Sequence, residues 1–231
     1  MNILPEGLPL LLIQVLVLII SITVHESAHA LVAYMLGDET ARSRGRISLN
    51  PLNHIDYFGT IILPGLMLMT GGPVFAFAKP VPVYLGNLKH PKRDEVLVSL
   101  AGPVSNLVLA GIATLALRIL VQQGFIGSLI VQQLSPNMLY LLCTYGITIN
   151  LTLAFFNLIP IPPLDGSSVL VFFLRGKALL AYYRMQQYAM PILLGILYIL
   201  PELLHIDLLQ LYFGATVYPL TDMLFTIALG L

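Results

Sequence analysis

Long apolar stretches are the feature that most constrains how this 231-residue chain can fold. About 20 consecutive apolar residues in a helix cross the ~30 Å hydrocarbon core of a bilayer. Only 10% of the residues are charged, whereas soluble globular domains carry about 25%. The sequence therefore predicts an integral, multi-pass membrane protein that is all-α and has five to six transmembrane helices. Six stretches are near or above the spanning length: Leu8–Leu36, Gly59–Ala78, Val96–Val121, Met138–Ile159, Ala178–Leu200 and Leu208–Leu229.

No linker between these stretches is long enough to separate domains. We expect a single membrane-embedded domain over residues 1–231, with a core at about 8–170 and a C-terminal helical hairpin at about 177–230. The net charge is zero, so nothing indicates a nucleic-acid partner. The protein is expected to lie in a lipid bilayer. The sequence does not determine the oligomeric state, and a homo-oligomer is possible.

The basic residues test the topology, because Lys and Arg favour cytoplasmic loops. All three basic groups share the cytoplasmic face if Gly59–Ala78 enters the membrane and returns as a re-entrant or broken segment. We therefore prefer five crossings with an external N-terminus, and six crossings is the alternative. The groups are Arg42, Arg44 and Arg46; Lys79, Lys89, Lys92 and Arg93; and Arg175, Lys177 and Arg184.

Two connecting pieces are predicted to be short membrane-proximal β-strands. Ser43–Leu49 alternates in part, and Lys79–Leu85 alternates Pro with β-branched Val. Because proline cannot donate a ladder hydrogen bond, the second piece would be an edge strand. Such an edge could accept a strand from a substrate.

The first apolar stretch contains the motif His-Glu-Ser-Ala-His at residues 25–29. Residues four apart lie on one face of a helix, so His25 and His29 can offer two imidazoles to one zinc ion. Glu26 can then act as general base toward a metal-activated water. An ionisable group in mid-membrane costs about 2.5–3.5 kcal/mol on insertion scales, so three in five residues indicate a functional site. His29 lies ~10 Å along the helix from the end of the stretch, which places the site in the bilayer, nearer the cytoplasmic face.

Catalytic zinc has three protein ligands as a rule, so one ligand is missing. Asp165 is the better candidate, because it follows three prolines at the end of the fourth stretch, in backbone that cannot be helical. His54 is the alternative, while His90 and His205 lie in unsuitable loops. Asp165 could also be a solvated residue of a surface loop, and a His2Asp set would accept other divalent ions besides zinc.

Together these motifs resemble the site-2 protease family of intramembrane zinc metalloproteases, and in particular its compact, short-chain prokaryotic members. The resemblance runs from about Ser21 to Leu170 and rests on the histidine motif, the Asn-x-x-Pro-x-x-Pro-Leu-Asp-Gly sequence at 157–166, and Ala-Gly-Pro-Val-Ser-Asn at 101–106. It implies one Zn²⁺ per chain bound by His25, His29 and Asp165, with Glu26 as general base. It also implies that Asn157 steadies the substrate carbonyl or oxyanion, although a helix-terminal amide that caps nearby backbone is the other interpretation.

The predicted function is that of a zinc metalloendopeptidase that hydrolyses peptide bonds in transmembrane or signal-peptide-like segments. A metal or proton transporter is a second hypothesis, but it needs ionisable residues along several helices. Of the two stretches Val96–Val121 and Met138–Ile159, only the first holds a charged residue, Arg118, near its end. A catalytically silent relative that binds membrane peptides is a third hypothesis, against which the complete motif argues.

Overall fold

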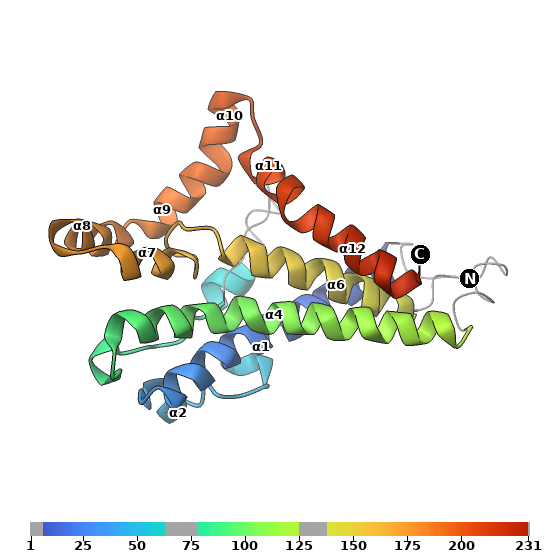
Figure 1. Cartoon of the computed structure of the whole chain (residues 1–231), viewed down its shortest axis with the longest axis horizontal. Coiled ribbons are helices and arrows are strands. Elements are labelled where there is room, and N and C mark those ends of the chain that lie inside the picture. Colours follow the sequence, from blue (N-terminus) through green and yellow to red (C-terminus); the bar gives the residue numbers. More distant parts are fainter. Residues whose placement is uncertain (1–6, 63–77, 125–137, 231) are drawn as a thin grey trace. The chain divides into compact units, whose positions relative to one another are not determined.

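The computed structural model describes residues 7–62, 78–124 and 138–230 (Figure 1). Helices make up most of this part of the chain, as the apolar stretches predict. Three of the described helices are long and apolar enough to cross a membrane. A fourth span is added if two helical segments joined at a bend, Gly176–Gln186 and Ala189–Leu204, are counted together as one span. The three are α1 (Leu8–Met35), α4 (Pro91–Gln122) and α6 (Met138–Asn157). The chain therefore has the helices of an integral membrane protein.

The other helices are shorter. The first half of the chain has α2 (Thr40–Ser43), two 3₁₀ helices, η1 (Pro51–Asn53) and η3 (Leu85–Asn87), and the π-helix η2 (Tyr57–Ile62). After α6 come α7 (Ser167–Phe173), α8 (Gly176–Gln186), α9 (Ala189–Leu194), η4 (Gly195–Ile199), α10 (Leu200–Leu204), α11 (Leu208–Ala215) and α12 (Val217–Leu229).

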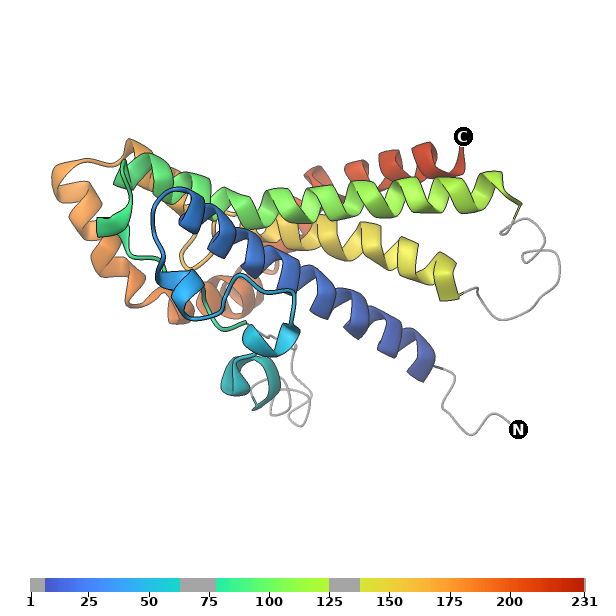
Figure 2. The same cartoon turned by 90° about the horizontal axis from the view of Figure 1, so that it is seen from below.

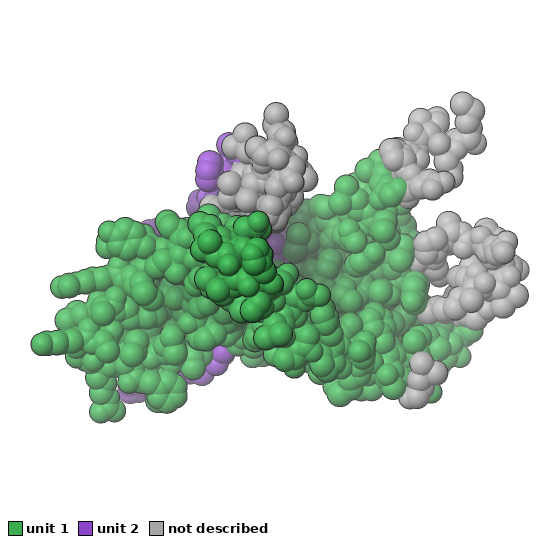
Figure 3. All heavy atoms as spheres, turned by 90° about the horizontal axis from the view of Figure 1, so that it is seen from above, with its two compact units in different colours: residues 1–21, 103–231 green, residues 22–102 purple. Residues whose placement is uncertain are grey.

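The chain divides into two compact units, coloured in Figure 3. Unit 1 comprises residues 1–21 and 103–231, and unit 2 comprises residues 22–102. In unit 1, α6 and α12 run beside the C-terminal part of α4 (Figures 1 and 2). Leu117 of α4, Ile147 of α6 and Val217 of α12 are buried in their shared core. Asn106 of α4 donates a hydrogen bond across this bundle to Asn150 of α6 at 2.8 Å, so the two polar residues satisfy each other in an apolar setting.

Two predicted spans are broken in the structure. Ala178–Leu200 is divided between α8 and the α9–α10 run, which meet at an angle of 81°. Pro191 explains this break, because its ring excludes the carbonyl of Gln187, four residues earlier, from a continuous helix. Leu208–Leu229 likewise forms α11 and α12, and Pro219 has the same effect on Ala215, the last residue of α11. The prediction of five to six crossings stays open, since most of Gly59–Ala78 lies outside the described residues.

No strand occurs in the described ranges, so the two predicted strands are not found there. Within Ser43–Leu49, Ser43 ends α2, and a turn follows in which the amides of Gly45 and Arg46 donate to the carbonyls of Arg42 and Ala41. The second segment is coil, and its backbone groups have loop partners instead of a neighbouring strand. The amide of Lys79 donates to the carbonyl of His54 at 2.9 Å.

Asp38 anchors this second segment in unit 2. Gly37, at φ +109°, ends the turn after α1 and allows the chain to reverse. Asp38 is fully buried and accepts hydrogen bonds from the amide of Tyr84 (2.7 Å) and the side chain of Asn87 (2.9 Å). Burial alone would raise the pKa of Asp38, but these bonds and those from Thr40 outweigh it, so the pKa lies below the ordinary value of 3.8.

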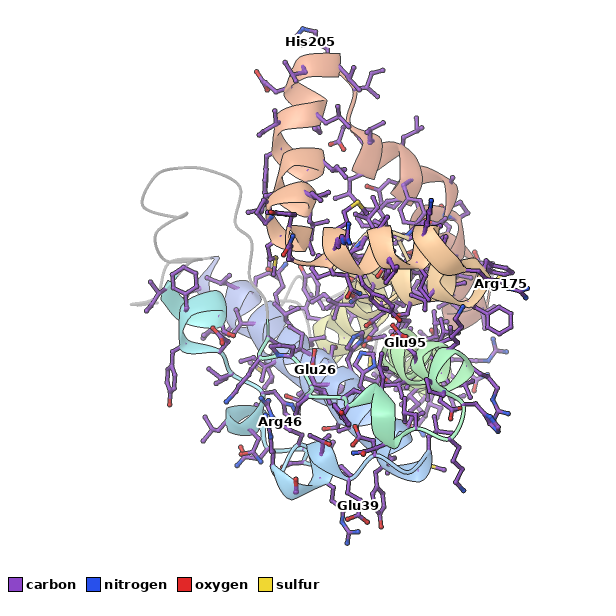
Figure 4. All side chains as sticks on the ribbon, turned by 90° about the vertical axis from the view of Figure 1, so that its left-hand side faces the viewer. Glu26, Glu39, Arg46, Glu95, Arg175 and His205 are labelled. Atoms are coloured by element: carbon purple, nitrogen blue, oxygen red, sulfur yellow. The ribbon has the colours of Figure 1, made fainter. Side chains whose placement is uncertain are left out.

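Replacing Asp38 with Ala should lower the free energy of unfolding by about 1–3 kcal/mol, because the amide of Tyr84 and the side chain of Asn87 then lose their acceptor. Thermal unfolding in detergent would measure the loss. Glu39→Ala is the matched control, since Glu39 is the exposed neighbouring carboxylate (Figure 4). Equal stability of the two variants would contradict the anchoring role.

The advantage of wild type over Asp38→Ala should also depend on pH. A carboxyl group with a lowered folded-state pKa stabilises the fold above its unfolded value, and that contribution is lost as the pH falls through the folded pKa. The difference in melting temperature should therefore be constant well above pH 3.8 and narrow below it. A difference that widens on acidification would contradict the charged state of Asp38.

Candidate metal centre

His25 and His29 both lie on α1, where the four-residue spacing places them on one face. Both side chains are buried, at 6% and 8% exposure. Their rings are in edge-to-face contact with centroids 4.6 Å apart, and one ring nitrogen of each lies within 4.8 Å of the other. Two imidazole nitrogens at this separation can bind one ion.

Helix α4 fixes the orientation of His29. The Nδ1 atom of His29 lies 2.7 Å from the carbonyl oxygen of Val98. A carbonyl can only accept, so Nδ1 carries the proton and donates it, and Nε2 keeps its lone pair. Zinc-binding histidines commonly donate their other ring N–H in this way, which sets both the tautomer and the direction of the ring.

Gly102 provides the space in front of the two rings. A Cβ atom at this position would lie 2.4 Å from Nε2 of His29 and 2.5 Å from Nε2 of His25. The two Nε2 atoms therefore converge on one point of α4, and only glycine leaves that point open. Val98 and Gly102 are four residues apart, so one face of α4 both orients His29 and makes room at the tips of both rings.

The donor atoms fit a zinc ion. Zinc binds imidazole nitrogen readily, and a buried pair whose Nε2 atoms converge can supply two of the ligands of a catalytic site. The space that a Cβ at Gly102 would fill is where an ion held by both Nε2 atoms would approach. In the sequence analysis Gly102 appears only within the Ala-Gly-Pro-Val-Ser-Asn sequence, and the role of the Val98 carbonyl is missed altogether.

Two carboxylates lie on the helices that carry these groups. Glu26, next to His25, is half-buried on α1, and Glu95 is half-buried on α4, three residues before Val98 (Figure 4). The sequence predicted a role for Glu26. It gave no role to Glu95, whose spacing of seven residues from Gly102 places it on the same face of α4.

His54, the alternative third ligand, has another task in unit 2. Its Nε2 lies 2.8 Å from the carbonyl oxygen of Ser48 and 3.3 Å from the hydroxyl of Ser27. Ser27 itself donates to the same carbonyl. His54 thus holds the loop before η1 against α1 behind the histidine motif, and within the described residues it does not join the His25–His29 pair.

The remaining histidines are exposed. His90 precedes α4, where its amide donates to the carboxylate of Asp94 at 2.8 Å. His205 lies in the left-handed turn between α10 and α11 (Figure 4).

Asp165 and Asn157 belong to unit 1, at the two ends of the turn that follows α6. The amide of Gly166 donates to the carbonyl of Asn157 at 2.6 Å and closes the turn. A Cβ on Gly166 would lie 2.2 Å from the carbonyl oxygen of Leu158, so glycine is required there. Asp165 is half-buried immediately before α7. The side-chain amide of Asn157 donates to the carbonyl of Leu153 at 3.0 Å, in its own helix, which is the capping interpretation of this residue.

Replacing Gly102 with Ala should weaken zinc binding by about 10–100-fold, the usual loss when a group that positions metal ligands is changed. The protein should still fold, because the ends of the imidazoles can move aside, whereas the metal geometry cannot survive that movement. Chelator competition would give the affinity, and the spectrum of the Co²⁺ form would report the geometry.

Gly111→Ala is the matched control for this variant, since it lies on the same helix with no atom within 4 Å of the added Cβ. It should bind zinc as the wild type does. Equal zinc affinities for the two variants would show that Gly102 does not provide the space for the ion.

Comparison with known proteins agrees with this geometry. The chain matches the family described as "Peptidase family M50" over residues 13–200. It is 43% identical over 163 residues to "Putative zinc metalloprotease YwhC" of Bacillus subtilis, which covers 68% of this chain and 66% of the relative. It is 31% identical over 185 residues to "Putative zinc metalloprotease Rip2" of Mycobacterium tuberculosis, covering 80% and 66% of the two chains.

A third relative, "Putative zinc metalloprotease MJ0611" of Methanocaldococcus jannaschii, is 30% identical over 114 residues, 49% of this chain and 52% of that protein. The matched part thus spans about two thirds of the first two relatives and about half of the third. No solved structure matches the chain. The family match includes the histidine motif and the Asp165 turn, and its extent means that the chain belongs to peptidase family M50, the site-2 protease family that its motifs resemble.

Proposed function

We propose that this protein is an intramembrane zinc endopeptidase that hydrolyses peptide bonds in transmembrane or signal-peptide-like segments. The observation that carries the proposal is the convergence of two buried Nε2 atoms, from His25 and His29, on the gap at Gly102. This pair lies within α1, a helix apolar enough to span a bilayer. His29 is six residues from the end of α1, or ~10 Å. That depth favours a substrate that is itself in the membrane, attacked nearer the cytoplasmic face.

The proposed ligands are His25, His29 and Asp165. Asp165 is supported by the chemistry of a carboxylate oxygen, which completes a three-ligand zinc set, and by the closed turn that fixes it between Asn157 and α7. When bound, zinc would lower the pKa of a coordinated water and polarise the substrate carbonyl. The alternative ligand His54 is less favoured, because within the described residues it does not group with His25 and His29.

The chain's own residues would then handle the protons. Glu26 adjoins His25 and would take the proton from the attacking water and later give it to the leaving amine. Asn157 keeps a second amide hydrogen besides the one donated to Leu153, and this hydrogen could stabilise negative charge on the scissile carbonyl oxygen. A helical substrate must first unwind, since its peptide carbonyls are otherwise engaged in backbone hydrogen bonds.

Replacing Glu26 with Gln should reduce cleavage of a fluorogenic membrane peptide by about 100-fold or more, the usual contribution of a general base. Zinc content should be unchanged, because Glu26 is not a ligand. Glu39→Gln, at an exposed carboxylate, should cleave at the parental rate. Cleavage by Glu26→Gln at that same rate would exclude Glu26 as the base.

Replacing Asp165 with Ala should lower zinc affinity and stoichiometry in the purified protein, because two imidazoles alone make an incomplete site. Asp222→Ala, at an exposed carboxylate of α12, is the control and should retain full metal content. Metal analysis of both variants beside the wild type measures the effect. An unchanged zinc affinity in Asp165→Ala would exclude Asp165 as a ligand and would favour His54 as the third ligand.

A further inference from the structure

The segment that follows Asp165 carries a concentration of positive charge. Between Asp165 and Glu202 there is no acidic residue, whereas Arg175, Lys177 and Arg184 are all present. All three are exposed, and they lie on or beside α8. Arg175 is at the outer edge of this segment in Figure 4. Nothing in the segment's own sequence neutralises this charge.

Helix α8 has two chemically different faces. Tyr182 is 5% exposed, and its hydroxyl donates to the hydroxyl of the buried Ser167 at 2.9 Å, which seats α8 on the start of α7. Lys177 and Arg184 are seven residues apart, so they share a face, and that face points away from Tyr182. Leu180, between them, is 59% exposed. The outer face of α8 is therefore basic with an exposed apolar residue between the two charges.

Exposed aromatic residues flank the basic face. Phe172 and Phe173, at the end of α7, are 52% and 72% exposed, and their rings meet edge to face at 5.4 Å. Tyr188, just after α8, is 58% exposed. Basic residues beside exposed aromatic residues are typical of helices that lie in the interface between a membrane and water.

The direction of α8 agrees with that position. The run from Ala189 to Leu204 is apolar and makes an angle of 81° with α8. If that run enters the bilayer along the membrane normal, α8 lies nearly parallel to the membrane surface. The basic face can then meet the lipid headgroups, and the exposed phenylalanines beside it can supply apolar contacts.

We propose that α7 and α8 form a binding surface for anionic phospholipid headgroups, with Arg175, Lys177 and Arg184 as the charged contacts and Phe172 and Phe173 as apolar anchors. The hydroxyl contact of Tyr182 with Ser167 connects this surface to a residue two positions after Asp165. Through this contact, lipid binding at α8 would affect the turn that holds Asp165, the third proposed zinc ligand. Only this connection to the zinc site rests on the proposed function.

The chain contains no tryptophan, which allows a direct test. Phe173→Trp introduces one fluorophore at the aromatic anchor. The full-length variant is reconstituted in vesicles that contain brominated phosphatidylglycerol or brominated phosphatidylcholine at the same mole fraction. Quenching should be stronger with the anionic lipid. Each basic residue near an anionic surface contributes a factor of about five, so three together predict a preference of up to roughly 100-fold at low salt.

Arg175→Gln, Lys177→Gln and Arg184→Gln together should abolish the preference in the Phe173→Trp protein. The matched control is Lys89→Gln, Lys92→Gln and Arg93→Gln, which removes the same charge around the start of α4 and should leave the preference intact. Equal quenching by both lipids, no quenching by either, or a preference that survives the first triple variant would overturn the proposal. The quenching measurement needs neither bound metal nor peptide cleavage, so its result is independent of whether the protein is a protease.

Discussion

Two imidazoles buried in an apolar helix require a neighbouring helix that accepts a hydrogen bond from one ring and leaves space at the ends of both rings. The packing of α1 against α4 in unit 2 follows from this requirement. Helix α4 does so within one turn, through the carbonyl of Val98 and the missing side chain of Gly102. His25 and His29 are four residues apart on α1, and Val98 and Gly102 are four residues apart on α4, so each pair lies on one face of its helix. The site is therefore formed by the faces of two helices as much as by a motif.

The loops of unit 2 contact α1 at two places, the histidine motif and the C-terminal end of the helix. Behind the motif, Ser27 and His54 share the carbonyl of Ser48. At the end of the helix, the Asp38 carboxylate binds the amide of Tyr84 and the side chain of Asn87. Arg46, itself buried, donates to the carbonyl of Asn53 at 2.6 Å. Side chains thus satisfy backbone groups that a sheet would otherwise pair, which is why this region is stable without strands in its described part.

The sequence predicts those features that depend on local period and composition. Spacing alone places His25 and His29 on one face of α1, and length and polarity alone identify α1, α4 and α6. The break at Pro191 was also readable, because proline in a long apolar stretch interrupts a helix. Gly102 and Asp38 were not, because their roles depend on residues about 50–75 positions away that only the fold brings near. Asn157 shows the same limit: its side-chain amide could bond its own helix or face a substrate, the sequence does not choose between these roles, and in the structure the amide donates to Leu153.

The gap at Gly102 also bears on how relatives of this chain should be interpreted. A protein with an intact His-Glu-x-x-His helix but a side chain at the equivalent of Gly102 would possess the motif without the room for an ion. Such a chain would pass any motif search and still bind the metal only weakly. One position on a second helix would therefore separate peptidases from silent members of the family, and it can be inspected in any genome without a structure.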